Sequence, residues 1–215
     1  MTSAATLPPA RLRVAILGAL ASFAGLAVLA VGAPAALAAI DVPMSEFARG
    51  SSYSSAFRDV SLLGATEVAV LFAMVVGLLL WQRCRAAALI YPAAILASAA
   101  LNVVLKTAID RPRPPAPATA TALASFPSGH SFQVTVVLGL LPVLCRHVGV
   151  PQPLALVVRL LALTGIVAVG VSRVYLGAHW VTDVVAGVLV GAVVVLGTER
   201  LLTRNVPTVC HCPAG

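Results

Sequence analysis

Hydrophobic stretches of about 20 residues alternate with short polar segments along most of the chain. Six such stretches can be delimited, at residues 14–40, 61–81, 86–106, 131–148, 154–176 and 179–199. A helix of about 20 apolar residues spans the hydrocarbon core of a bilayer. The pattern therefore predicts an all-α, polytopic membrane protein with six transmembrane helices.

The first stretch could instead be a cleaved signal peptide, because Ala36-Leu37-Ala38 resembles a cleavage site. The apolar region of a signal peptide is about 7–15 residues long, and this stretch is longer. We interpret it as a retained helix. The chain then divides into a flexible N-terminal tail at 1–10, a six-helix transmembrane domain at 11–204 and a C-terminal tail at 205–215.

Polar and proline-containing segments separate the predicted helices. Residues 41–60 predict an external loop with room for a short surface helix, and residues 82–85 a basic turn. Residues 107–127 contain four closely spaced prolines at 112, 114, 115 and 117. Proline lacks a backbone donor and resists helix formation, so an irregular loop is expected there.

Composition agrees with a membrane protein: 60% of the 215 residues are hydrophobic and 10% are charged, whereas soluble domains carry about 25% charged residues. A net charge of +7 would suggest nucleic acid in a soluble chain. Here the basic residues flank apolar segments, so they report topology and no nucleic-acid partner is expected. The four cysteines do not predict a disulfide framework.

The distribution of basic residues favours a cytoplasmic N-terminus. With that orientation the cytoplasmic side carries eight arginines: Arg11, Arg13, Arg83, Arg85, Arg146, Arg159, Arg200 and Arg204. The external side carries six cations: Arg49, Arg58, Lys106, Arg111, Arg113 and Arg173. The last four lie in polar clusters that we expect to be functional. When these four are left out, two external cations remain.

Three polar clusters interrupt the apolar sequence between Lys106 and Asp183. Each lies where a predicted helix begins or ends, and the alternation of helices brings all of these ends to one side. The expected members of a shared site at the external face are Lys106, Arg113, Ser128, Gly129, His130, Arg173, His179 and Asp183.

The cations suit a phosphate group. Arginine offers paired donors and lysine a compact charge, and a single cation at a helix end would otherwise be read as snorkelling to the interface. Ser128 and Gly129 lie where a loop enters a helix, and backbone N–H groups at a helix N-terminus attract anions. We therefore expect Lys106, Arg113 and Arg173 to bind phosphate together with Ser128 and Gly129.

The histidines suit nucleophilic catalysis. His179 and Asp183 are spaced i, i+4 and should share one helix face, so the carboxylate can fix the tautomer of the imidazole and leave the other nitrogen free to attack. His130 lies at the start of the predicted helix at 131–148 and can protonate a leaving oxygen as general acid. Asp110 and Arg111 are expected to pair locally, and Glu67 to pair with a site arginine or inside the bundle.

These motifs resemble those of the phosphatidic acid phosphatase type 2 superfamily. The pattern K-x6-RP, PSGH and SR-x5-H-x3-D is matched by Lys106, Arg113-Pro114, Pro127-Ser128-Gly129-His130, Ser172-Arg173, His179 and Asp183. The resemblance implies a six-helix core shared with haloperoxidases, and a metal-independent phosphatase without cofactor. It also implies that His179 forms a phosphohistidine, supported by Asp183, and that His130 protonates the leaving group.

The resulting hypothesis is a lipid phosphatase of the inner membrane, with its active site on the external, periplasmic face. Undecaprenyl or another polyprenyl diphosphate and phosphatidate-type lipids are the expected substrates. A lipid phosphotransferase using the same intermediate is the first alternative, and a small anion or lipid transporter is the alternative outside enzymes. Vanadium haloperoxidases share the motifs but are soluble, which this apolar chain is not.

Overall fold

A computed structural model describes residues 8–49, 55–115 and 124–205. All regular secondary structure in these residues is helical, in agreement with the all-α prediction. The helices are α1 (Pro9–Gly32), α2 (Pro34–Arg49), α3 (Ser55–Leu62), α4 (Thr66–Leu80), α5 (Arg85–Ile109), α6 (Gly129–His147), α7 (Gln152–Tyr175) and α8 (Val181–Asn205).

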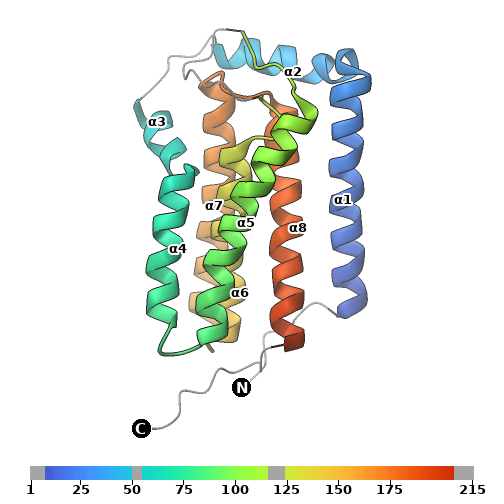
Figure 1. Cartoon of the computed structure of the whole chain (residues 1–215). Coiled ribbons are helices and arrows are strands. Elements are labelled where there is room, and N and C mark those ends of the chain that lie inside the picture. The colour runs from blue at the N-terminus through green and yellow to red at the C-terminus, as the bar shows by residue number, and fades with distance from the viewer. Residues whose placement is uncertain (1–7, 50–54, 116–123, 206–215) are drawn as a thin grey trace.

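The helices form a bundle of membrane-spanning length (Figure 1). Among the described residues, five helices are long and apolar enough to cross a bilayer, and a sixth span results if α3 and α4 count as one segment bent by 47°. The predicted polytopic helical architecture is therefore confirmed, with five to six candidate spans, and the second predicted segment contains a break. In Figure 1, α2 lies crosswise over one end of the bundle.

The N-terminal part of the prediction needs correction. The sequence predicts one helix over 14–40 followed by a loop from residue 41, but α1 ends at Gly32 and α2 continues to Arg49. Pro34 is the cause: it disfavours helical geometry in the residue before it, and it is well suited to the first position of a new helix. Ala33 accordingly leaves the helix, with φ −145° and ψ 57°.

The predicted ends of the domain also move slightly. α1 begins at Pro9, inside the predicted tail at 1–10, and residues 1–7 of that tail lie outside the described residues. α8 begins at Val181 rather than at residue 179 and runs to Asn205, and the rest of the predicted tail at 205–215 lies outside the described residues. Cys84 is disulfide-bonded, which the sequence did not predict.

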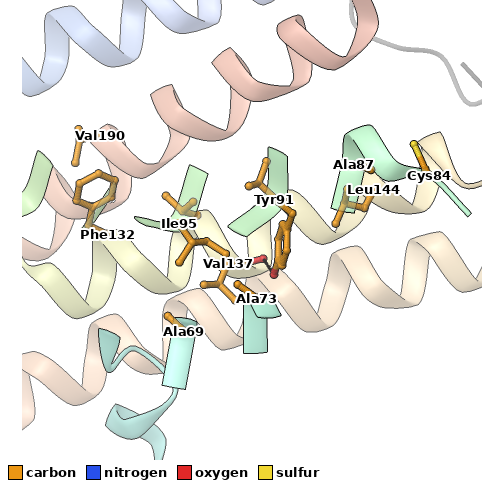
Figure 2. Close-up of a cluster of buried hydrophobic side chains, with 12 residues drawn as sticks. Ala69, Ala73, Cys84, Ala87, Tyr91, Ile95, Phe132, Val137, Leu144 and Val190 are labelled. Atoms are coloured by element: carbon orange, nitrogen blue, oxygen red, sulfur yellow. Dashed lines mark hydrogen bonds between the residues drawn. The ribbon is translucent and has the colours of Figure 1, made fainter. Parts of the chain in front are cut away.

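The hydrophobic core centres on α6, the span with the largest buried share, 56%. Figure 2 shows side chains of α4, α5, α6 and α8 meeting there, among them Tyr91, Ile95, Phe132 and Val190. The Tyr91 hydroxyl donates to the carbonyl of Val137 at 3.0 Å, so this buried polar group is satisfied. The outward faces of the spans carry exposed large apolar side chains, as expected of helices that contact lipid.

Small residues bring α8 close to α6. Added Cβ atoms would lie 2.6 Å from the backbone oxygen of Ser128 at Gly187, and 2.7 Å from the Cβ of Thr135 at Gly191. Two glycines four residues apart form the small-residue stripe that lets membrane helices approach closely. This contact presses the beginning of α8 against the beginning of α6, where two of the polar clusters lie.

We expect Gly187→Ala to destabilise the protein, because the new methyl group meets backbone that cannot move aside. Overpacking of this kind costs about 1–3 kcal/mol, which outweighs the ~1 kcal/mol that alanine gains in a helix. The measurement is the thermal unfolding midpoint in detergent. Gly18→Ala is the matched control, because no atom lies within 4 Å of an added Cβ there. Equal midpoints for both variants would contradict the close packing of α8 on α6.

Candidate active site

The three polar clusters meet at the end of the bundle that α2 crosses (Figure 1). Two hydrogen bonds to backbone carbonyls join them: the N–H of Ser128 donates to the carbonyl of Asp183 at 2.9 Å, and Arg113 Nη1 donates to the carbonyl of Ala178 at 2.6 Å. The ends of α5 and α7 and the beginnings of α6 and α8 thus share one site, as the alternation of segments predicts.

Ser128 is the N-cap of α6 and is fully buried. Its Oγ accepts from the backbone N–H of Ser131 at 3.4 Å and from the Ser131 hydroxyl at 3.0 Å. Gly129 and His130 occupy the first turn, where backbone N–H groups have no partner within the helix. This turn therefore presents donors and the positive end of the helix dipole to the site.

Lys106 and Arg173 are buried cations, each 4% exposed. The Nζ of Lys106 donates to the carbonyls of Ala124 at 2.6 Å and Ser125 at 3.4 Å. Arg173 Nη1 donates to the hydroxyl of Ser61 at 2.6 Å, and its Nε has no hydrogen-bond partner. Among the described residues neither cation forms a salt bridge, so both carry positive charge that an anion can neutralise.

His179 lies between α7 and α8, two residues before α8 begins. The prediction that it shares a helix with Asp183 is therefore wrong, but the two side chains still meet, with Nδ1 3.6 Å from Asp183 Oδ2. Asp183 is in the first turn of α8, and its Oδ2 accepts from the N–H of Trp180 at 3.0 Å. On the other side of the ring, Nε2 lies 3.4 Å from Arg113 Nη1.

The imidazole of His179 is neutral at pH 7. Burial lowers its pKa to about 4, the charges of Lys106 and Arg173 act in the same direction, and Asp183 acts in the opposite direction. A neutral ring whose Nδ1 faces a carboxylate carries its proton on Nδ1. Its Nε2 then holds a lone pair on the side where Arg113 lies.

His130 is half-buried and interacts electrostatically with Arg173, His179, Lys106 and Arg113. The break between α3 and α4 packs directly against it, because a Cβ on Gly64 would lie 2.8 Å from its carbonyl oxygen and 2.9 Å from its Cβ. The bend therefore positions the second histidine as well as Ser61, the partner of Arg173.

Sequence reasoning missed two charged residues of the site. The expected pairing of Arg111 with Asp110 is not found. Instead, Arg111 Nη1 donates to Asp183 Oδ1 at 2.6 Å, and its Nη2 donates to Asp41 Oδ2 at 2.7 Å. Asp41, expected in an external loop, is 1% exposed and also accepts from the N–H of Thr182 at 3.0 Å. The position of Arg111 two residues before Arg113 was a usable signal, whereas nothing in the sequence singled out Asp41.

Glu67 and Asp110 contribute nothing visible to the site. Glu67 is exposed in the first turn of α4, with no hydrogen bond or ion pair to a described residue, so neither of the two expected roles is seen. Asp110 ends α5 in the left-handed region with φ 44°. An aspartate tolerates this geometry better than most residues.

The described residues contain no group of three or more His, Cys, Asp or Glu side chains arranged to hold a metal ion. The positive charge of the site comes from Lys106, Arg113 and Arg173.

The fold and the site together define a class: helical membrane proteins with histidines and buried cations gathered at one end of the bundle. Residues 87–207, more than half of the chain, match the PAP2 superfamily. The chain belongs to this superfamily.

Two known proteins are similar to this chain. Phosphatidylglycerophosphatase B of Bacillus subtilis (strain 168) is 41% identical over 93 residues, which cover 42% of this chain and 46% of that protein. The crystal structure of the first transmembrane PAP2 type phosphatidylglycerolphosphate phosphatase from Bacillus subtilis superposes with a TM-score of 0.81 at 26% identity. That match covers 88% of this chain and 96% of the other.

Proposed function

We propose that this protein is a membrane-embedded lipid phosphatase that works through a phosphohistidine on His179. The observation that carries the proposal is the environment of that ring. Its Nδ1 faces Asp183 at 3.6 Å, its Nε2 faces Arg113 at 3.4 Å, and the buried cations Lys106 and Arg173 act on the same ring. A neutral nucleophile surrounded by positive charge suits attack on an anionic phosphorus centre.

The proposed reaction has two displacements. In the first, the Nε2 lone pair of His179 forms a bond to phosphorus, the bond from phosphorus to the lipid oxygen breaks, and His130 gives that oxygen a proton. In the second, His130 takes a proton from water as the water oxygen bonds to phosphorus, and the N–P bond breaks with its electrons returning to Nε2. Inorganic phosphate leaves, and both histidines are regenerated.

The other site residues would stabilise charge. Lys106, Arg113 and Arg173 neutralise the equatorial oxygens of the transferring phosphoryl group. The backbone N–H groups at the beginning of α6, behind Ser128 and Gly129, supply further donors. Asp183 holds the Nδ1 proton of His179 and stabilises the ring as it becomes positive.

The substrate class is a lipid phosphate monoester or diphosphate, because the site lies at the end of apolar spans where a lipid head group would reach it. Polyprenyl diphosphates and phosphatidate-type lipids fit this class. The name of the Bacillus relative adds phosphatidylglycerophosphate as a candidate. Parallel measurements of phosphate release from each lipid decide among them.

We expect the wild-type protein to release inorganic phosphate from at least one of these lipids and to form an acid-labile phosphoenzyme. His179→Ala should lose both activities, because the nucleophile is gone. His130→Ala should form the phosphoenzyme about 100–10,000 times more slowly, the usual contribution of a general acid. Rapid quench with phosphorus-labelled lipid measures both steps.

The matched control is His147→Ala, a buried histidine near the end of α6 that lies away from the site. It should retain activity. A phosphoenzyme that persists in His179→Ala would disprove the assignment of the nucleophile. Transfer of the phosphoryl group to a second lipid, without phosphate release, would favour the phosphotransferase, and lipid flux in His179→Ala would favour the transporter.

Metal removal is a separate test. We expect activity to persist in EDTA, because the three site cations Lys106, Arg113 and Arg173 can perform the charge neutralisation that magnesium performs elsewhere. Turnover is measured before and after dialysis against EDTA, with and without added magnesium. Loss of turnover that magnesium restores would contradict metal-independent hydrolysis.

The proposed location is the inner membrane with the site facing the periplasm. The support is the charge distribution, because Arg83 in the turn between α4 and α5 and Arg85 at the start of α5 lie at the end of the bundle opposite the site (Figure 1). Basic turns favour the cytoplasmic side.

We expect Pro115→Cys, at an exposed position next to the site, to react with an impermeant thiol reagent in intact cells. Arg83→Cys, exposed in the opposite turn, should react only after permeabilisation. Labelling is compared with that of the parent protein, which carries the native cysteines. Labelling of Arg83→Cys alone in intact cells would invert the proposed orientation.

A further inference from the structure

One guanidinium joins two buried carboxylates beside the site. Arg111 Nη1 lies 2.6 Å from Asp183 Oδ1 and Nη2 lies 2.7 Å from Asp41 Oδ2. The side chains of Arg111, Asp41 and Asp183 are 7%, 1% and 0% exposed. In such a buried cluster each charge depends on its partners, because water cannot replace them.

Each end of this cluster has a structural anchor. Asp41 belongs to α2, where its Oδ1 accepts from the N–H of Thr182 at 3.0 Å and its Oδ2 from the Thr182 hydroxyl at 2.6 Å. Arg111 Nη1 also donates to that hydroxyl at 2.8 Å, and Trp180 lies under the guanidinium at 5.7 Å. The crosswise helix α2 is thereby fastened to the first turn of α8.

The two oxygens of Asp183 have different partners. Oδ1 receives the guanidinium of Arg111, and Oδ2 receives the N–H of Trp180 and faces Nδ1 of His179. Arg111 therefore fixes the plane of the carboxylate and determines which oxygen is presented to the imidazole. It also neutralises part of the negative charge that the imidazole experiences.

We propose that Arg111 and Asp41 are positioning residues that set the orientation and the basicity of His179 through Asp183. The inference rests on the proposed function for its catalytic consequence. Arg111 and Asp41 touch neither the attacking nitrogen nor the cation cluster in the contacts described above. They act through the carboxylate, in the way that outer partners orient the ligands of metal sites and commonly change activity about 10–100-fold.

Removing the charge of Arg111 and removing the charge of Asp41 should shift the pKa of His179 in opposite directions. In Arg111→Gln, Asp183 keeps its full negative charge, which favours the protonated imidazole, so the acidic limb of kcat/KM moves to higher pH. In Asp41→Asn, Arg111 serves Asp183 alone and neutralises it more completely, so the limb moves to lower pH. A unit charge acting across ~10 Å of protein produces a shift of about one pH unit.

The other charged groups around His179 are unchanged in these variants. They are Lys106 on α5, His130 on α6, Arg173 on α7, Asp183 on α8 and Arg113 in the segment after α5. The shifts can therefore be assigned to the substituted residues.

The experiment compares pH profiles of kcat and KM for wild type, Arg111→Gln, Arg111→Lys, Asp41→Asn and Asp59→Asn. We expect kcat to fall about 10–100-fold in Arg111→Gln and Asp41→Asn with a small change in KM. Arg111→Lys keeps the charge and should keep the wild-type limb. Asp59→Asn is the control, because Asp59 is exposed on α3 and forms no salt bridge with a described residue.

A second readout does not need turnover. The nitrogen NMR shifts of the His179 ring, measured against pH in isotope-labelled protein and assigned by comparison with a His179→Gln spectrum, report its protonation directly. If the wild type releases phosphate from no lipid, the proposed function fails, and this titration still decides the positioning inference. Equal or unshifted titrations in Arg111→Gln and Asp41→Asn, with activity falling only in step with folded protein, would overturn it.

Discussion

The cost of burying charge in a membrane protein governs this structure. A charged side chain removed from water must find a partner or leave the bundle, because the hydrocarbon region offers no water to solvate it. Most of the chain meets this constraint by being apolar. Buried cations gather at one end of the bundle, where Lys106, Arg111 and Arg173 are at most 7% exposed. The helix ends and the crosswise helix α2 are arranged around these three cations.

The central helix α6 connects this constraint to packing. Its middle is held by the apolar side chains around Tyr91 and Phe132 (Figure 2), and its beginning is pressed against α8 at Gly187. Because α8 approaches so closely, the N–H of Ser128 can reach the carbonyl of Asp183 at 2.9 Å. The N-terminal ends of α6 and α8 are thus joined directly by a backbone hydrogen bond.

In the sequence, the lengths of the apolar segments predict the membrane spans, and the spacing of the motifs predicts the candidate site residues. Polar residues such as Lys106 and His179 stand out in apolar surroundings, and counting helices places them on one side. The break at Pro34 was missed because the apolar run continues through it, and hydropathy does not measure backbone geometry. Asp41 was missed because a carboxylate after an apolar run usually marks the start of a loop. Its burial depends on a partner, Arg111, that lies 70 residues away in the sequence.

The buried cations fall into two groups that differ in their hydrogen-bond partners. Arg111 has carboxylate partners on both sides, so its charge is already neutralised and it holds α2, Asp183 and α8 together. Lys106 and Arg173 contact only neutral oxygens in the described contacts, so their desolvation is not compensated within the protein. In the proposed phosphatase, the phosphate group of the substrate would supply the missing partner. On that proposal, the desolvation cost of Lys106 and Arg173 is compensated only when the anion binds beside the lone pair of His179.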